Sequence, residues 1–325
     1  MNYRILVFGF LAITISSHLN ESKAQSLSEG VLLRQQGKFK EARLFFENVL
    51  KNDENNADAH SNLGMIYLDR RNSEYDVDKA VDETEKAVEL NPNKGEIQFN
   101  YGAALGIKTQ NSGVFKQAFL AVKVKKAFQR AVELDPNLLM ARIALGQFYL
   151  MAPSIIGGDN DEGWKQIDEA IKIDEVQGRF VKASMLAQKD NKPDAEKEYK
   201  TLVSSYPKEW RTWKGYGYFC LREKRTDEAI KHFQKYVDLR PDTADSYQSL
   251  AEALIKKGEA DEALENLHKS LSLDKEYVPA IISVGDAYII KGQKKEAKES
   301  YQRAISLAQF DYYKKQAEKK LKEVE

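Results

Sequence analysis

The sequence predicts an all-α protein, a solenoid of about eight helix-turn-helix repeats followed by a C-terminal capping helix. Three observations predict this fold. From Val176 to Asp311 the same residue types return at one constant interval without a gap, interrupted copies of the pattern precede this stretch, and prolines fall between the copies. A fixed period of this length is typical of a solenoid, in which no unit can bury its apolar face alone. Function is therefore expected on a surface rather than in a closed pocket.

Each regular unit is expected to form two antiparallel helices. Gly258 and Gly292 lie five residues before Ala263 and Ala297 in two successive units. The first helix should end near the glycine, where a left-handed backbone costs little. The second helix should present the alanine where it crosses the first, because a larger side chain would hold the two axes apart.

The N-terminal half carries the same units with insertions, so the predicted solenoid spans residues 25–311. The eight repeats are expected to start near residues 23, 57, 95, 139, 176, 210, 244 and 278. Prolines at positions 92, 136, 207 and 241 should stop one helix and stiffen the turn before the next. Residues 312–325 place Tyr313, Ala317 and Leu321 at helical spacing, which is typical of a helix that caps the last apolar edge.

The pattern W-x2-L-G-x2-Y, then A-x3-F-x2-A, then P, with the constant interval between units, resembles that of tetratricopeptide repeats. The last unit matches it best, with Val284, Gly285, Tyr288, Gly292, Ala297, Tyr301 and Ala304 in register. The resemblance covers nearly all of the chain after Ala24. It implies helix pairs stacked in a right-handed superhelix whose first helices line a concave groove.

The segment 1–24 predicts a secretory signal peptide. Arg4 is followed by an almost unbroken apolar run over residues 5–15, and Ser22-Lys23-Ala24 has the small-x-small pattern of a cleavage site. Cleavage after Ala24 would leave Gln25 as the first mature residue; the alternative is that the run forms a first helix of the solenoid. No cysteine lies directly after the run, so we expect no lipoprotein anchor. We expect a soluble protein that is periplasmic or secreted, without a transmembrane segment.

Composition narrows the classes of function. Fifty basic and fifty acidic residues cancel, so there is no electrostatic footprint for nucleic acid. Cys220 is the only cysteine, which excludes an intramolecular disulfide and favours a buried thiol.

Residues that could carry catalysis are scattered. The four histidines, at positions 18, 60, 232 and 268, fall in separate repeats or in the signal peptide, and none of the common catalytic motifs occurs. The acidic run 159–163 lacks the ligand spacing of a calcium loop and reads better as a helix cap. The sequence predicts no enzyme, cofactor or metal site.

Two departures from the regular repeat are candidates for function. The first is an apolar loop, Met151–Asp159, whose candidate residues are Ile155, Ile156, Gly157 and Gly158. Long apolar loops are idle less often than polar ones. This loop resembles an A-P-x-x-x-G-G segment of a group of exported bacterial tetratricopeptide proteins. Alternatively, its two isoleucines tuck over the ends of neighbouring helices.

The second departure is Gly106–Lys126, where phenylalanines and valines alternate with lysines. Such a basic amphipathic stretch can bind a membrane surface or a partner helix. Because it continues without a breaker into Ala127-Phe128, an early start of the second helix is favoured.

Groove residues are predicted by taking positions that alternate with the packing positions of the first helices. In the N-terminal half these are apolar: Leu27, Val31, Met65, Leu68, Phe99, Ile143 and Leu150. In the C-terminal half they are mostly polar: Phe180, Arg211, Lys214, Tyr218, Gln248, Glu252 and Asp286. We expect the groove to hold a peptide or helix of a protein partner with an apolar and a charged part. The alternative is that the inserted segments cover the apolar set, so that these residues belong to the core.

The predicted function is that of an exported scaffold for protein–protein interaction, such as an envelope assembly factor. The alternative is a periplasmic protein that binds a small ligand in an apolar cavity of the N-terminal half, bordered by Phe99 and Ile155. The sequence leaves the partner and the oligomeric state open.

Overall fold

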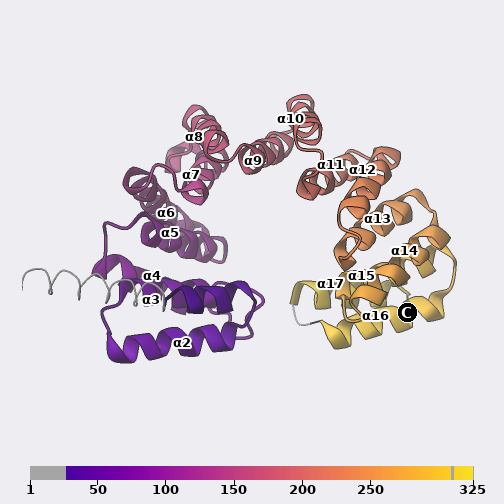
Figure 1. Ribbon diagram of the computed structural model, residues 1–325, viewed down its shortest axis with the longest axis horizontal. Coiled ribbons are helices and arrows are strands. Elements are labelled where there is room, and N and C mark those ends of the chain that lie inside the picture. Colours follow the sequence, from indigo (N-terminus) through magenta and orange to yellow (C-terminus); the bar gives the residue numbers. More distant parts are fainter. Residues whose placement is uncertain (1–26, 309–310, 325) are drawn as a thin grey trace, which may run out of the picture. The chain divides into compact units, whose positions relative to one another are not determined.

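The computed structural model describes residues 27–308 and 311–324, and the predicted signal peptide lies outside them. Within the described residues every regular element is helical, and successive helices pair along the chain (Figure 1). This confirms the predicted all-α repeat fold. The chain divides into two compact units, Met1–Gln166 and Ile167–Glu325.

Unit 1 is a stack of helix pairs whose first helix covers residues 27–35. Its further elements are α2 (Phe39–Asn52), α3 (Ala57–Tyr67), α4 (Val77–Leu90), α5 (Gly95–Gln110), α6 (Val114–Leu134), α7 (Leu139–Met151), the 3-10 turn η1 (Ser154–Ile156) and the start of α8 (Asn160–Ile173). Its central core joins Leu105 of α5 to Leu120 and Phe128 of α6. α6 is a single helix of 21 residues, so the lysine-rich stretch is the predicted early start of a second helix.

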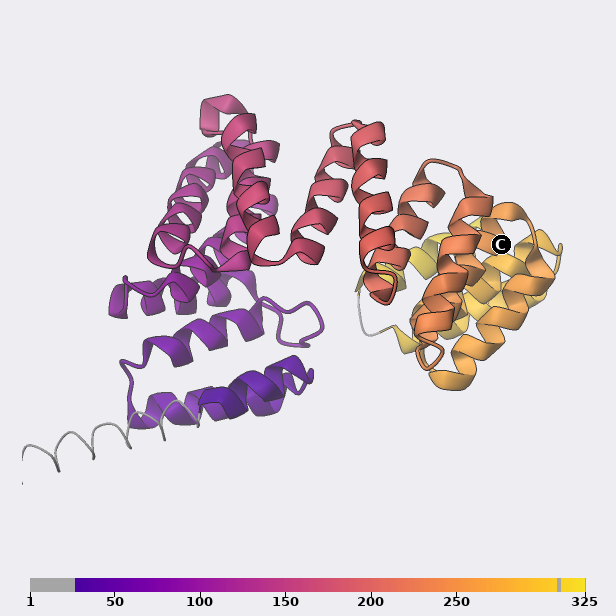
Figure 2. The ribbon, with the colours of Figure 1, turned by 45° about the horizontal axis from the view of Figure 1, so that its top comes forward.

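Unit 2 holds the regular repeats. Its elements after α8 are α9 (Glu175–Gln188), α10 (Lys192–Ser205), α11 (Trp210–Arg222), α12 (Thr226–Leu239), α13 (Ala244–Lys257), α14 (Ala260–Leu273), α15 (Val278–Ile290), α16 (Lys294–Leu307) and α17 (Asp311–Val324). α17 is the predicted cap: it buries Ala317 against the last repeat, with Tyr313 and Leu321 packed beside it. Figure 2 shows these last helices side by side in yellow.

The constant offset of glycine within a repeat has one packing reason. A Cβ added at Gly102, Gly217 or Gly285 would meet the ring of Phe128, Phe233 or Tyr301, respectively, at 2.3–2.6 Å. Each ring belongs to the second helix of the same repeat. The glycine therefore lets an aromatic side chain pack directly against the first helix. Alanines such as Ala229, Ala263 and Ala297 are completely buried on the second helices, as predicted.

The turn between the two helices of a repeat often uses a left-handed residue. Gly37, Gly258 and Gly292 have φ of 76°, 89° and 72°. Asp190 and Lys224 adopt the same conformation, with φ of 61° and 60°. The turn geometry is therefore kept in two repeats that lack the glycine, where it costs the chain more.

Candidate functional site

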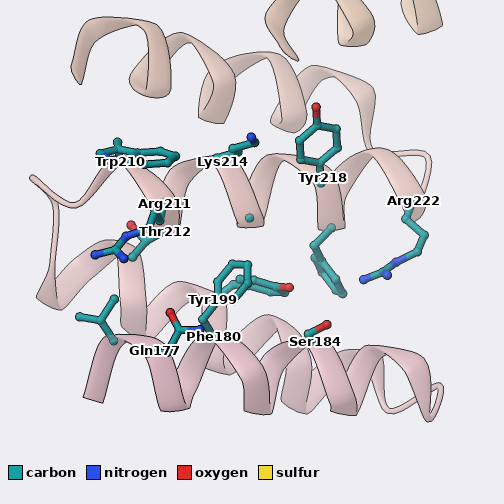
Figure 3. A pocket seen from close by; sticks show the side chains of 13 residues that line it. Gln177, Phe180, Ser184, Tyr199, Trp210, Arg211, Thr212, Lys214, Tyr218 and Arg222 are labelled. Atoms are coloured by element: carbon teal, nitrogen blue, oxygen red, sulfur yellow. The ribbon is translucent and has the colours of Figure 1, made fainter. Parts of the chain in front are cut away.

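The first cavity of unit 2 lies between α9 and α11 and has a volume of about 410 Å³. Its floor is aromatic: Phe180 of α9 points toward α11 with Tyr199 of α10 beside it (Figure 3). The two rings meet edge to face, with centroids 6.2 Å apart. A Cβ at Gly215 would meet the Phe180 ring at 2.2 Å, so the missing side chain on α11 makes room for that ring. The volume falls within the range of ligand pockets.

The rim of this first cavity is basic. Arg211, Lys214 and Arg222 line it, and among the described residues that line it no side chain is acidic. The guanidinium of Arg222 lies 5.9 Å from the centroid of the Phe219 ring. An apolar floor below a basic rim suits a segment in which an apolar side chain stands next to an acidic group.

The second cavity of unit 2 has a volume of about 470 Å³ and is lined by α11, α13, α15 and α17. Its walls are mostly polar, and two ion pairs tie its helices together. Lys214 Nζ lies 2.7 Å from Asp245 Oδ2, and Lys320 Nζ lies 2.7 Å from Asp286 Oδ1. The first pair joins successive first helices and the second joins the last of them to α17, so both hold the walls of the cavity in place.

Asp245 is the centre of the first of these ion pairs. Its carboxylate also accepts hydrogen bonds from the hydroxyls of Tyr236, at 2.5 Å, and Tyr277, at 3.1 Å. Burial alone would raise the pKa of Asp245, but the Lys214 ammonium and the two hydroxyls outweigh it and hold the pKa below its usual value. Asp245 is therefore charged, and its carboxylate oxygens already have partners within the fold.

Glu252 is in the opposite situation. Burial raises the pKa of this carboxyl, and the compensating contacts are weak: Gln248 Nε2 donates to it at 3.4 Å. Glu252 lines the second cavity together with Gln248 and the exposed Lys256. A carboxylate that has lost water without gaining a close cation is suited to receive a positive charge from a bound partner.

The two cavities adjoin, because Lys214 and Tyr218 of α11 line both. Together they form what we call the unit 2 groove. Every groove residue predicted in the C-terminal half lies in it: Phe180 and Arg211 in the first cavity, Gln248, Glu252 and Asp286 in the second, and Lys214 and Tyr218 in both.

Some lining residues were missed by the sequence analysis. They are Trp210, Arg222, Tyr277, Tyr313 and Lys320. Arg222 continues the spacing of Lys214 and Tyr218 by one further turn, so it could have been found. The α17 residues could not, because the sequence does not show onto which side of the last repeat a capping helix folds.

The residues predicted for the N-terminal half do not gather in the same way. Leu27 and Val31 line a polar-edged hollow with Asp58 and Lys94. Met65 and Leu68 are half-buried, and Phe99 is packed on Phe128 with ring centroids 6.0 Å apart. Ile143 and Leu150 are each only 4% exposed, so placing them in an open groove was wrong. Both are buried by the packing of α7, whose apolar residues exceed what one helix face can hold.

The apolar loop is ordered by its backbone. Gly157 has φ of 96°, and a Cβ at Gly158 would meet the Ala152 carbonyl oxygen at 1.8 Å, so both glycines are required by the turn. Ile156 is half-buried, but Ile155 is 92% exposed. The alternative that both isoleucines tuck over helix ends is therefore wrong for Ile155.

Two further predicted features, the cap of α8 and a buried cysteine, are present in the structure. Asp159 accepts hydrogen bonds from the backbone of residues 161 and 162, at 3.0 and 3.1 Å, which is the predicted cap of α8. Cys220 is fully buried, as predicted, and burial raises the pKa of its thiol to about 12. Over the described part of the chain, no group of three His, Cys, Asp or Glu side chains could hold a metal ion, and none of the helices could cross a membrane.

The repeat geometry agrees with the family to which the sequence belongs. Family models described as tetratricopeptide repeat match residues 27–93, 180–244, 244–277 and 278–311. These residues make up more than half of the 325-residue chain, so the chain belongs to the tetratricopeptide repeat family. No curated protein matches the sequence.

The solved structures that share the fold include the following two. Yeast Tom70 is 17% identical, with a TM-score of 0.68, over 88% of this chain and 58% of the Tom70 chain. A tetratricopeptide repeat protein from Parabacteroides merdae is 14% identical, with a TM-score of 0.51, over 94% of this chain and 99% of the other. This chain thus spans less than two thirds of the Tom70 chain. At these identities the likeness shows the fold alone.

Proposed function

We propose that this protein is an exported, non-catalytic scaffold that holds a peptide segment of another protein in the unit 2 groove. The observation that carries the proposal is the position of α11: Lys214 and Tyr218 form a wall common to an aromatic cavity with a basic rim and a polar cavity that contains Glu252. Two adjoining cavities of different chemistry suit an elongated occupant with different side chains along its length.

The proposed occupant follows from the two cavities. An aromatic or aliphatic side chain would fill the space above Phe180, and an adjacent acidic group would meet Arg222. A basic side chain further along the segment would reach Glu252. Repeats of this family typically hold other proteins rather than carry out reactions, which supports a binding role.

Export is the part of the proposal that rests on the N-terminal sequence. Arg4, the apolar run over residues 5–15 and the cleavage pattern ending at Ala24 support export. A role in envelope assembly is proposed only as one use of an exported scaffold. The small-ligand alternative has lost its support, because Ile155 is exposed instead of enclosing a cavity with Phe99.

The test uses site-specific photo-crosslinking in the native host. A photoreactive phenylalanine analogue replaces Ser184, a half-buried residue that lines the first cavity. We expect a discrete crosslinked partner at this position and none from the same analogue at Lys269, an exposed residue of α14 that lines neither cavity.

A charge reversal then tests the basic rim. Arg222→Glu should reduce the crosslinked product several-fold, whereas Lys231→Glu on the exposed side of α12 should not. Arg222 is preferred to Lys214, because losing Lys214 would leave Asp245 buried without its cation. Equal yields from the wild type and Arg222→Glu would count against the proposed groove.

A further inference from the structure

The outer face of α6 carries an apolar stripe that is not covered by the part of the chain the structure describes. Phe115 is 96% exposed, Phe119 is 64% exposed and Val122 is 43% exposed. Spacings of four and three residues place the three side chains on one side of the helix, and we call them the outer stripe. Packing of unit 1 is provided by the opposite side of α6, where Leu120, Val124 and Phe128 enter the core.

Two exposed phenylalanines on one helix face are unusual. Single exposed apolar residues need no explanation, but a row of them marks a surface that meets something else. Here neither ring belongs to the core of unit 1. The packing of unit 1 therefore does not explain why these phenylalanines are present.

Positive charge surrounds the outer stripe. Residues 114–126 contain Lys116, Lys123, Lys125 and Lys126 and no acidic residue, although the whole chain is neutral. Lys123 Nζ lies 5.5 Å from the centroid of the Phe119 ring and 3.9 Å from Glu85 of α4. Helical spacing puts Lys116 and Lys123 on one flank of the stripe and Lys125 on the other.

The position of Lys125 supports that arrangement. Its ammonium lies 5.8 Å from the centroid of the Tyr149 ring, and its side chain rests against Gly157, next to η1. Lys125 is thus directed to the side of α6 where α7 and η1 pack. The outer stripe is left between two basic flanks.

We propose that the outer stripe of α6 binds the surface of a bilayer that contains anionic lipids. The helix lies along the surface, Phe115 and Phe119 enter the boundary between headgroups and acyl chains, and the flanking lysines contact lipid phosphates. We choose an anionic bilayer as the binding partner because its negative headgroups complement the four lysines of residues 114–126. An apolar groove on a protein would not require these lysines. This binding is independent of the unit 2 groove.

The test places an environment-sensitive NBD fluorophore on Phe119→Cys in the full chain. Labelling is selective because Cys220 is fully buried. With vesicles of phosphatidylglycerol and phosphatidylcholine, we expect a blue shift of emission and quenching by brominated lipid. The matched control carries the label on Lys51→Cys, an exposed position of α2, and should show neither effect.

Several outcomes would overturn the proposal. They are an unchanged emission at position 119, equal changes at 119 and 51, and equal binding to phosphatidylcholine vesicles alone. The apolar residues 5–15 are present in both labelled chains. If the protein bound vesicles through these residues alone, the label at position 119 would either not respond or respond to the same extent as the label at position 51. A shift at position 119 that depends on protein concentration without vesicles would assign the stripe to self-association instead.

Two further variants measure the contribution of the stripe and of the lysines around it. Phe115→Ser with Phe119→Ser should weaken vesicle binding at least about tenfold, because two aromatic side chains no longer leave water. Lys116→Glu with Lys126→Glu should weaken it on anionic vesicles to a similar degree. Both proteins should keep the wild-type melting temperature, since these side chains are exposed. Unchanged affinity in either variant would contradict the proposal.

Discussion

Lys320 of α17 donates a hydrogen bond to the carboxylate of Asp286 on α15 at 2.7 Å. The same oxygen accepts from the hydroxyl of Tyr301 on α16, also at 2.7 Å. One carboxylate thus joins both helices of the last repeat to the helix that follows them. Since Lys320 and Asp286 also line the second cavity, α17 is at once a cap and a wall of the unit 2 groove.

Removing this cation should weaken the C-terminal end of the fold. Lys320→Met should lower the free energy of unfolding by about 1–2 kcal/mol, because the partly buried Asp286 loses its charge partner. Lys319→Met is the matched control, since Lys319 is 80% exposed and lies 4.0 Å from Glu323. Denaturant unfolding of both variants measures the difference, and equal midpoints would contradict the role assigned to Lys320.

Stability at acid pH should depend on Glu196, which Arg225 contacts through two nitrogens, each at 2.9 Å. The hydrogen bonds from Arg225, then from Lys200, lower the pKa of Glu196 from 4.5 to about 2. A lowered pKa in the folded state means that the unfolded chain binds more protons between these values. The stabilisation is therefore present above pH 4.5 and is lost as the pH falls toward 2.

The measurement is the melting temperature as a function of pH. Glu196→Gln should lower it near neutral pH and flatten its decline between pH 4.5 and 2, whereas Glu265→Gln, at an exposed position of α14, should leave the profile unchanged. Parallel profiles for the wild type and Glu196→Gln would show that the pair with Arg225 does not contribute.

Replacing either of two glycines in first helices by alanine should change the stability, in opposite directions. A Cβ at Gly217 would meet the fully buried Phe233 ring at 2.6 Å, so Gly217→Ala should destabilise by about 1–3 kcal/mol. Gly106 in α5 has nothing within 4 Å of that position, so Gly106→Ala should stabilise by about 0.5–1 kcal/mol through helix propensity. Denaturation curves decide the signs; a stabilising Gly217→Ala would refute the packing account of this glycine.

Glu252→Gln should raise the stability of the protein but weaken its binding to the partner. Burial raises the pKa of Glu252 in the folded state, so folding favours the protonated form and stability falls as the pH rises through and above 4.5. The neutral variant should therefore melt at a higher temperature near neutral pH, with the gain disappearing in acid. If Glu252 receives a cation from the partner, the same variant should crosslink less partner through position 184. A variant that is less stable, or that binds the partner normally, would contradict this account.

Much of the fold could be predicted because the same packing positions recur in successive repeats. The alignment of Gly258 with Gly292 and of Ala263 with Ala297 indicates turn and crossing positions without any knowledge of distant contacts. The left-handed turns at Asp190 and Lys224 were not predicted. There the flanking helices impose the conformation, and the local residue carries no signal for it.

The groove was predicted less evenly. Regular spacing along α11 placed Arg211, Lys214 and Tyr218 correctly on the lining face. The rule worked here because the first helices of neighbouring repeats have the same arrangement of packing positions. In α7 the same rule failed for Ile143, since that helix is apolar on nearly all sides and its open face cannot be recognised from spacing. Exposure of Phe115 and Ile155 was likewise invisible in the sequence, where an apolar residue reads as core.

The common wall of the two cavities has a consequence for selectivity. Lys214 and Tyr218 stand one helical turn apart on α11, and Asp245 fixes Lys214 from the neighbouring helix. Under the proposed function, a segment anchored above Phe180 would meet Glu252 only if its own basic residue followed the anchor at a fitting interval. The protein would then recognise the spacing between two side chains of its partner, and a partner with the right residues at the wrong interval would be rejected.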